Sequence, residues 1–303
     1  MSIVAIIPAS IGVGQVPYIN IKKLGSRPLL AYSIKAALHS QIIDRVIVST
    51  ENQELANIAE EYGAEVPFIR PMELARDAAP LGKVLLHCVD FLENEEGYSV
   101  DTIVVIVPGY PLLRSETIDL GVKKLKTTGV DTIISMTEYK NEFWIRINDE
   151  LTAVSGKLID ESESSPMFWK NFAVTVTRRT SLKPDTFIGP KVDYIIMDKQ
   201  CSYRVNALDK FGVVERMLGL PRVLIRVDGS NDIGMGHVYS AIRIAKHIRR
   251  THEAEIMFLM SAQKPEGTLK VSREGFPVEV FPEEEIDLCI EAIRRFTPNV
   301  IVN

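Results

Sequence analysis

Short apolar runs alternate with longer stretches of helical periodicity in the first half of the chain. The runs at 3–8, 45–49 and 102–107 are continuous and rich in Val and Ile, which is typical of strands buried on both faces. Between and after these runs, apolar residues recur at helical spacing over 28–39, 52–62 and 80–93. Strand and helix in this alternation predict βαβ units that build a parallel sheet.

The helix expected at 52–62 carries signals at both of its ends. Asn52 is a typical N-cap residue, and Leu55, Ile58 and Ala59 fall on one face. Gly63 follows as a residue that ends the helix. A further strand is expected at 131–136, and after it a mixed region in which β-type runs dominate, namely 171–177 and 193–197.

The pattern starts again near residue 220. A helix at 209–218 ends in Gly219-Leu220-Pro221, and the run 223–228 (VLIRVD) has the character of a new first strand. Helices and strands then alternate at 238–250, 255–260, 266–274, 278–281, 284–295 and 299–302. The fold class predicted is α/β. A nucleotidyltransferase-type, Rossmann-like domain with a mixed sheet (1–218) precedes a smaller, truncated doubly wound unit (222–303).

Composition narrows the class of protein. Hydrophobic residues make up 46% of the 303 residues and charged residues 25%, which excludes a disordered chain. With 35 Lys+Arg against 40 Asp+Glu the net charge is −5, so no global basic field would hold nucleic acid or an anionic membrane.

The segments that direct a chain to a membrane or to export are not recognisable in this sequence. No apolar run reaches the roughly 18 residues of a membrane span, and no basic segment precedes the apolar start. Cys88, Cys201 and Cys289 are scattered, which favours a reducing compartment over disulfide bonds. We therefore expect a cytoplasmic protein with no nucleic-acid or membrane partner.

A glycine-bearing loop follows the first strand. It runs from Ser10 through Gly12 and Gly14 to Asn20, at the sheet edge where open α/β proteins bind ligands. Backbone amides of such a loop can hold phosphate, whereas glycines also serve any tight connection. From the loop alone, a nucleotide-binding site and a plain connecting loop both remain open.

Several motifs bear on this choice. The run 42–50 (IIDRVIVST), the pattern Ala56-x-x-Ala59 and the segment 63–66 (GAEV) are followed by 70–77 (RPMELARD). In this order they resemble the acylneuraminate cytidylyltransferases, the CMP-sialic acid and CMP-ketodeoxyoctonate synthetases. The resemblance runs over about residues 1–218.

The resemblance implies a function and a set of site residues. The family motif QPTSPLR corresponds to 107–113 (VPGYPLL), and the family N-G-A corresponds to Asn171-Phe172-Ala173. By resemblance, Ser10, Gly12, Gly14 and Asn20 would bind the nucleotide, and Arg70, Pro108 and Asn171 the acidic sugar. The implied ligands are CTP and a nine-carbon acidic sugar, the implied cofactor is Mg²⁺, and the implied assembly is a homodimer formed through 137–190.

Two motifs depart from the family pattern. The family loop carries basic residues that hold the triphosphate, and none stands at the corresponding positions between Ser10 and Asn20. The family D-I-D, which holds Mg²⁺, is replaced by Arg204-Val205-Asn206, so no metal-binding residues are assigned. The first hypothesis, which the resemblance implies, is an enzyme of the acylneuraminate cytidylyltransferase type that acts in surface-glycan biosynthesis. The two departures predict that its synthetase activity is small or absent. The alternative is a catalytically silent protein that binds a sugar acid or nucleotide, or scaffolds a partner enzyme.

The second unit begins with a motif of its own. Arg226-x-Asp228 leads into Gly234-x-Gly236-His237, which is similar to the start of the UDP-sugar hydrolase of pseudaminic acid synthesis, a relative of the GT-B glycosyltransferases. The resemblance makes His237 a candidate general base. The alternative is that His237 caps or packs at a helix start.

Four further side chains are assigned to packing. His87 and Cys88 lie at positions of apolar periodicity and are expected in or beside the core. Trp144 and Trp169 could stack on a base or a sugar, but we expect them to pack inside the chain or to cover a dimer surface.

Overall fold

The computed structural model describes the chain except for residues 1, 12–15, 76–78, 140–142, 154–166, 231–233, 253, 264 and 283–285. Contacts between residues divide it into two compact units. The first comprises Met1–Lys22 and Leu29–Leu208, and the second Lys23–Pro28 and Asp209–Asn303. The functional boundaries at 218 and 222 stay a prediction.

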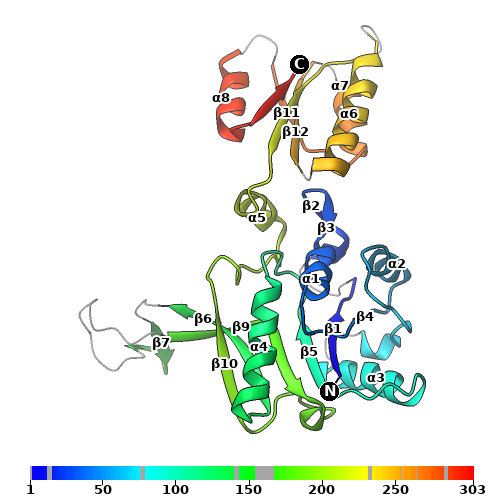
Figure 1. The fold of residues 1–303 in the computed structure, drawn as a ribbon. Coiled ribbons are helices and arrows are strands. Elements are labelled where there is room, and N and C mark those ends of the chain that lie inside the picture. The colour runs from blue at the N-terminus through cyan, green and yellow to red at the C-terminus, as the bar shows by residue number, and fades with distance from the viewer. Residues whose placement is uncertain are drawn as a thin grey trace. The chain divides into compact units, whose positions relative to one another are not determined.

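The first unit is built on a six-stranded sheet. Its order is β10-β6-β9-β5-β1-β4, with bounds Val192–Met197, Thr132–Tyr139, Met167–Arg178, Thr102–Ile106, Ile3–Pro8 and Arg45–Ser49 (Figure 1). Strand β1 pairs in parallel with β4 and β5, while β9 runs antiparallel between β5 and β6. This confirms the predicted mixed α/β sheet.

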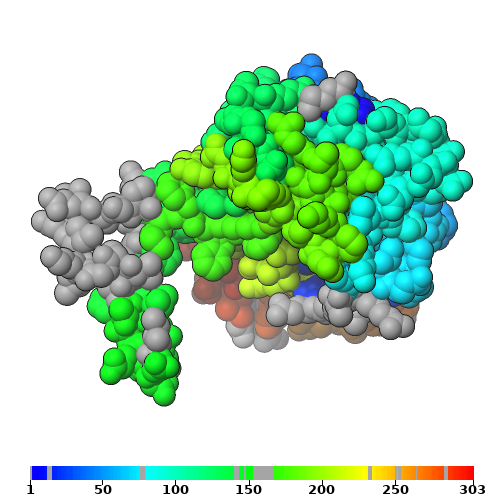
Figure 2. Space-filling model, turned by 90° about the horizontal axis from the view of Figure 1, so that it is seen from below, coloured from blue at the N-terminus to red at the C-terminus, as the bar shows by residue number. Residues whose placement is uncertain are grey.

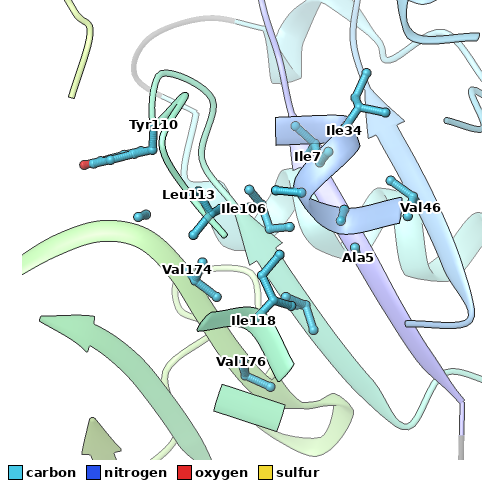
Figure 3. Close-up of a cluster of buried hydrophobic side chains, with 14 of the residues drawn as sticks. Ala5, Ile7, Ile34, Val46, Ile106, Tyr110, Leu113, Ile118, Val174 and Val176 are labelled. Carbon is cyan, nitrogen blue, oxygen red and sulfur yellow. The ribbon is translucent and has the colours of Figure 1, made fainter. Parts of the chain in front are cut away.

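Helices cover both faces of this sheet. Buried side chains of α1 (Leu29–Leu38), α2 (Gln53–Glu61) and α4 (Ser115–Thr128) join one face in a single core cluster. Figure 3 shows part of that cluster, with Ile34 and Ile118 from the helices beside Ile7 and Ile106 from the strands. Helix α3 (Leu81–Asn94) packs on the opposite face through residues that include the buried Cys88, as expected.

The sequence signals at the helix ends predict α2 correctly, whereas the apolar pattern did not predict α4. Asn52 Oδ1 accepts a hydrogen bond from Leu55 N at 2.9 Å, and Gly63 has φ +93°, so both predicted ends of α2 are confirmed. Helix α4 did not emerge from the sequence pattern, because its apolar face is narrow and interrupted by charged residues. The short hairpins β2–β3 (Lys23–Leu24, Arg27–Pro28) and β7–β8 (Trp144–Ile147, Glu150–Ala153) were missed as well. Figure 2 shows β7–β8 standing out from the first unit.

The second unit is a four-stranded parallel sheet of order β13-β12-β11-β14. The strands span Val278–Phe281, Glu255–Ser261, Arg222–Arg226 and Val300–Val302. Core clusters place α6 (Gly236–His252) and α7 (Pro265–Arg273) on one face and α8 (Ile286–Phe296) on the other, which confirms the doubly wound arrangement. Helix α5 (Phe211–Met217) joins this unit with the β2–β3 hairpin, where Gly25 N donates to Glu215 Oε1 at 3.0 Å. None of the helices that the described residues form is long and apolar enough to cross a bilayer.

Candidate functional site

The carboxyl ends of the parallel strands define one edge of the first unit. Because β1 lies between β4 and β5 in parallel register, the loops after Pro8, Ser49 and Ile106 leave the sheet on the same side. Ligands of open α/β sheets bind beyond this edge. The predicted site residues of the first unit that the structure describes belong to loops or strands that reach it.

Arg70 ties two of these strand ends together. Its Nη1 donates to Ser49 O at 3.1 Å, and its Nη2 donates to Ala9 O at 3.3 Å and to Glu51 Oε2 at 2.6 Å. The side chain is 4% exposed. Burial lowers the pKa of Arg70, and the carboxylate of Glu51 acts in the opposite direction. This guanidinium is held by internal contacts, and its predicted role in binding the sugar stays a prediction.

The loop after β1 is closed at its base. Asn20 is buried and its Nδ2 donates to Ser10 O at 2.8 Å, while Tyr18 N donates to Ile11 O at 2.6 Å. Ile11 N also donates to Glu51 Oε1 at 3.0 Å, so the Arg70–Glu51 pair fixes the start of the loop. The predicted nucleotide-binding residues Gly12 and Gly14 lie outside the described residues.

The segment after β5 turns sharply at Gly109, where φ is +102°. Val205 N donates to Gly109 O at 2.7 Å, and a Cβ at position 109 would lie 3.0 Å from Val205 O. Pro108 and Tyr110 flank this turn. A glycine is therefore required both by the backbone angle and by the close approach of residues 204–206.

Tyr110 links this turn to β9. It is buried, and its hydroxyl donates to Asn171 O. Burial raises the pKa of Tyr110, and the nearby Arg204 acts in the opposite direction. Arg204 Cζ lies 5.9 Å from the centroid of the Tyr110 ring, and the Arg204 side chain is exposed. The structure thus brings Pro108, Asn171 and Arg204 into one neighbourhood.

The side chain of Asn171 takes part in three hydrogen bonds. Its Oδ1 accepts from Ser135 Oγ at 2.5 Å and from Ala173 N at 3.1 Å, and its Nδ2 donates to Thr137 Oγ1 at 3.0 Å. These bonds hold an irregularity in β9, since residues 171–174 bulge where the β6–β9 register shifts between Ile134 and Met136. The polar network explains why an amide stands at a position that is 6% exposed. Contact of Asn171 with a sugar stays a prediction.

Residues 204–206 do not fit a divalent metal. Mg²⁺ binds hard oxygen ligands, mostly carboxylates and water, whereas the positions in question offer the cation of Arg204 and the neutral amide of Asn206. In the part of the chain that the structure describes, no three His, Cys, Asp or Glu side chains gather as a metal site. Asp77 lies outside that part.

The loop after β11 is the corresponding feature of the second unit. Asp228 Oδ1 accepts from Ser261 N at 2.6 Å, and Arg226 Nη1 donates to Asp228 Oδ2 at 2.5 Å. Gly229 lies so close to α6 that a Cβ would come within 2.5 Å of Val238 Cγ2. His237 is exposed on the first turn of α6. The role of His237 as a general base stays a prediction.

Sequence reasoning missed the supporting residues of the site. Glu51, Ser135 and Thr137 orient Arg70 and Asn171, but they lie far from them in the sequence and carry no motif. Only the pairing of strands brings them together.

Comparison with known proteins bears on the first unit. A family model described as Cytidylyltransferase matches residues 4–173. A CMP-N,N'-diacetyllegionaminic acid synthase of Legionella pneumophila is 31% identical over 166 residues, which cover 54% of this chain and 70% of the relative. A pseudaminic acid cytidylyltransferase of Campylobacter jejuni is 28% identical over 155 residues, which cover 50% of this chain and 66% of the relative.

One solved structure and one relative named for two activities are also similar to this chain. A solved CMP:2-keto-3-deoxy-manno-octonic acid synthetase complexed with CTP aligns with a TM-score of 0.55 and 11% identity, covering 72% of this chain and 99% of its own. At that identity it supports the fold alone. A Helicobacter pylori protein named as a pseudaminic acid cytidylyltransferase and UDP-2,4-diacetamido-2,4,6-trideoxy-beta-L-altropyranose hydrolase is 33% identical over 96 residues, which cover 32% of this chain and 19% of that protein.

Proposed function

Because this chain belongs to the cytidylyltransferase family, we propose that it binds CTP and a nonulosonic acid at the carboxyl edge of the six-stranded sheet. A nonulosonic acid is a nine-carbon acidic sugar, and two of the relatives described above are named for synthesis of CMP-legionaminic acid or transfer of a cytidylyl group to pseudaminic acid. The loop 10–20 would receive the nucleotide. The segments 107–110 and 171–173 would receive the sugar.

Cytidylyl transfer requires positive charge at the site. In cytidylyl transfer, a sugar oxygen attacks the α-phosphorus of CTP and pyrophosphate leaves, so negative charge on the phosphates must be neutralised. Loss of a single electrostatic donor typically lowers turnover by about 10²–10³. This chain has no cation at the family positions of the loop, and it has Arg204 and Asn206 in place of two carboxylates. We therefore propose that it binds its ligands but has little or no synthetase activity.

The single observation that carries this proposal is the sequence Arg204-Val205-Asn206, fixed beside Gly109 by the Val205 N to Gly109 O hydrogen bond. Arg204 repels a divalent cation, yet a guanidinium can hold a phosphate through two hydrogen bonds. Nucleotide binding and transfer are therefore separable in this protein.

The test is release of pyrophosphate from CTP in the presence of N-acetylneuraminic, legionaminic or pseudaminic acid, with Mg²⁺ or Mn²⁺. We expect no metal-dependent release above the uncatalysed rate. Rapid metal-dependent turnover would show instead that this chain is a working synthetase, and that other carboxylates, such as Asp77 or Asp209, hold the metal.

Thermal stabilisation by CTP separates the two classes of function. A metal-requiring enzyme is stabilised by CTP only when Mg²⁺ is present, because the metal binds with the phosphates. A catalytically silent binding protein is stabilised equally with and without Mg²⁺, which is the expected result here. Absence of any stabilisation would favour a scaffold for a partner enzyme.

We also propose that the first unit forms a homodimer through the face of β6, β9 and β10 that α4 does not cover. Cross-strand pairing places Phe168, Tyr194 and Ile196 on this face, and they are 39%, 36% and 48% exposed. Trp144 in β7 and Trp169, which cross-strand pairing places on the other face of β9, are 48% and 66% exposed, so the expectation that they pack inside the chain is wrong. Exposed aromatic residues are typical of the buried centre of an interface.

Sedimentation at micromolar concentration tests the dimer. The unmodified chain should sediment as a dimer, and Ile196→Glu should sediment as a folded monomer because it places a charge in the apolar patch. A matched substitution on an exposed part of the opposite side, Glu60→Lys in α2, should leave the dimer intact. A monomeric unmodified chain would refute the proposal.

A further inference from the structure

Phe172 is held in a backbone conformation that its side chain disfavours. Its φ is +61°, in the left-handed region that glycine adopts freely and that is rare for a bulky aromatic residue. The ring does not fill the core in return, because Phe172 is 52% exposed. A conformation of this kind persists where the surrounding structure imposes it, and such positions gather at functional sites.

The surrounding structure does impose it. The Asn171 side chain is fixed to Ser135 and Thr137, and Ala173 O accepts from Val107 N at 3.1 Å. Phe172 is therefore clamped between two anchored neighbours within the bulge of β9. Its ring is exposed, and the backbone of the following residue is hydrogen-bonded to Val107, which precedes Pro108.

The ammonium group of Lys170 lies beside the ring of Phe172. Its Nζ lies 4.5 Å from the centroid of the Phe172 ring. The side chain is half-buried, and burial lowers the pKa of its ammonium group. Among the described residues no carboxylate forms an ion pair with this ammonium, in contrast to Lys124, which pairs with Asp193 at 2.9 Å. A partly desolvated cation without an anionic partner gains most from an anion that comes from outside the chain.

We propose that Lys170 and Phe172 form a specificity site for the acidic sugar, in which the ammonium receives the sugar carboxylate and the ring packs against its C–H face. This inference rests on the proposed function and adds to it the residues that recognise the acid. The ring supplies a flat apolar surface, and its cation–π contact keeps Lys170 over it. The strain at position 172 is maintained because it keeps this surface next to the ligand.

Substitutions at Phe172 should affect thermal stability and sugar affinity differently. Phe172→Gly relieves the backbone angle, so the thermal midpoint should stay unchanged or rise, whereas affinity for the sugar should fall about tenfold. Phe172→Asn, which tolerates φ near +60°, should behave in the same way. A residue with a merely structural role would lose stability when the ring is removed.

The carboxylate contact has a chemical signature. The unmodified protein, saturated with CTP, should bind N-acetylneuraminic acid at least about tenfold more tightly than the methyl ester of the same sugar, because only the acid offers a charged partner to Lys170. Lys170→Gln should bind acid and ester equally. The matched control is Lys199→Gln, since Lys199 Nζ also lies over an aromatic ring, 5.3 Å from the Tyr139 centroid, and its loss should leave the preference for the acid unchanged.

Two calorimetric titrations separate failure of this inference from failure of the proposed function: CTP into the free protein, and the sugar into the protein saturated with CTP. If the unmodified chain binds neither CTP nor the sugar, both are refuted. If it binds both, and Lys170→Gln keeps the preference for the acid, only the sugar site at 170–172 is refuted. Cross-strand pairing places Lys170 beside Met136 and Ile196, on the proposed dimer face. A Lys170→Gln variant that becomes monomeric with its preference intact would therefore assign Lys170 to subunit contact and would also overturn the inference.

Discussion

At the scale of single residues, burial decides what a charged side chain can do. Arg70 donates to two strand ends and to Glu51, and its side chain is 4% exposed. Taking two charges out of water costs free energy, which their attraction and hydrogen bonds must offset. The pair therefore specifies the geometry of the loop rather than adding much net stability.

We expect Arg70→Met to lower the free energy of unfolding by about 3–5 kcal/mol, because the carboxylate of Glu51 would remain buried without a cationic partner. Urea denaturation measures this loss. The control is Arg179→Met, which breaks a more exposed pair with Glu93 (29% and 28% exposed) and should cost about 1 kcal/mol or less. Equal losses in the two variants would contradict the buried-pair argument.

Glu215 provides a prediction on pH. Burial raises the pKa of this carboxyl group, and the hydrogen bond from Gly25 N opposes the rise only in part. The folded state therefore retains a proton that the unfolded state releases, so this group stabilises the fold below the unfolded pKa and destabilises it as the pH rises through the folded pKa.

Glu215→Gln keeps an oxygen for Gly25 N and removes this charge. It should raise the free energy of unfolding at pH 7, and its advantage over the unmodified chain should vanish below about pH 4.5, the ordinary range of a Glu carboxyl. Denaturation curves at several pH values measure the difference. Glu291→Gln on the exposed face of α8 is the control, and a Glu215→Gln variant with no pH-dependent gain would refute the argument.

At the scale of elements, the close packing of a helix against another segment limits the side chains that the helix can carry. In the first turn of α3, a Cβ at Gly82 would lie 2.4 Å from Lys183 O and 2.8 Å from Pro184 O. Those two atoms belong to the backbone and cannot move aside cheaply. The sequence around Gly82 gives no sign of this contact, because residues 183 and 184 lie about a hundred positions away.

Gly82→Ala should therefore destabilise the protein by about 1–3 kcal/mol, the usual cost of overpacking. Gly212→Ala in α5 is the matched control, since no heavy atom lies within 4 Å of the added Cβ and its φ is not positive. That variant should be neutral or stabilising by up to about 1 kcal/mol. Thermal denaturation of both variants measures the contrast, and a stable Gly82→Ala variant would mean that α3 can shift away from residues 183–184.

At the scale of the whole molecule, the chain has the cytidylyltransferase fold, while the charges at two of its motifs differ from the family pattern. If the loop after β1 still faces the nucleotide, Ser10→Arg combined with Gly14→Lys should tighten CTP binding about tenfold through charge-assisted hydrogen bonds. Calorimetry measures this change. The variant Ser10→Gln with Gly14→Gln adds the same bulk without charge and should give no gain. Unchanged affinity in the charged variant would place the nucleotide elsewhere.

The second unit leads to a separate prediction. Its resemblance to the start of a GT-B-like hydrolase implies a nucleotide held between two lobes, and its described residues form a single four-stranded sheet with His237 exposed. We expect no release of UDP from UDP-linked sugars by this chain on its own. Release that disappears in His237→Ala would contradict this expectation and assign the base to His237.

The sequence by itself determined the order and kind of most elements, since each follows from local periodicity and end signals. The buried runs of β1, β4 and β5, the cap at Asn52 and the restart at β11 are all readable along the chain. Motif order also identified the family, because matching residues at matching spacing need no knowledge of their contacts.

Only the tertiary structure decided which side chains act together. It assigned Arg70 to Glu51 and to two strand ends, enclosed Asn171 with Ser135 and Thr137, and placed Phe172 in a strained, exposed position. These relations join residues 19 to 61 positions apart, or depend on a backbone angle that strand pairing imposes. No local pattern encodes them, because the Arg70 contacts arise from the pairing of β1 with β4, and those of Asn171 and Phe172 from the packing of β9 between β5 and β6.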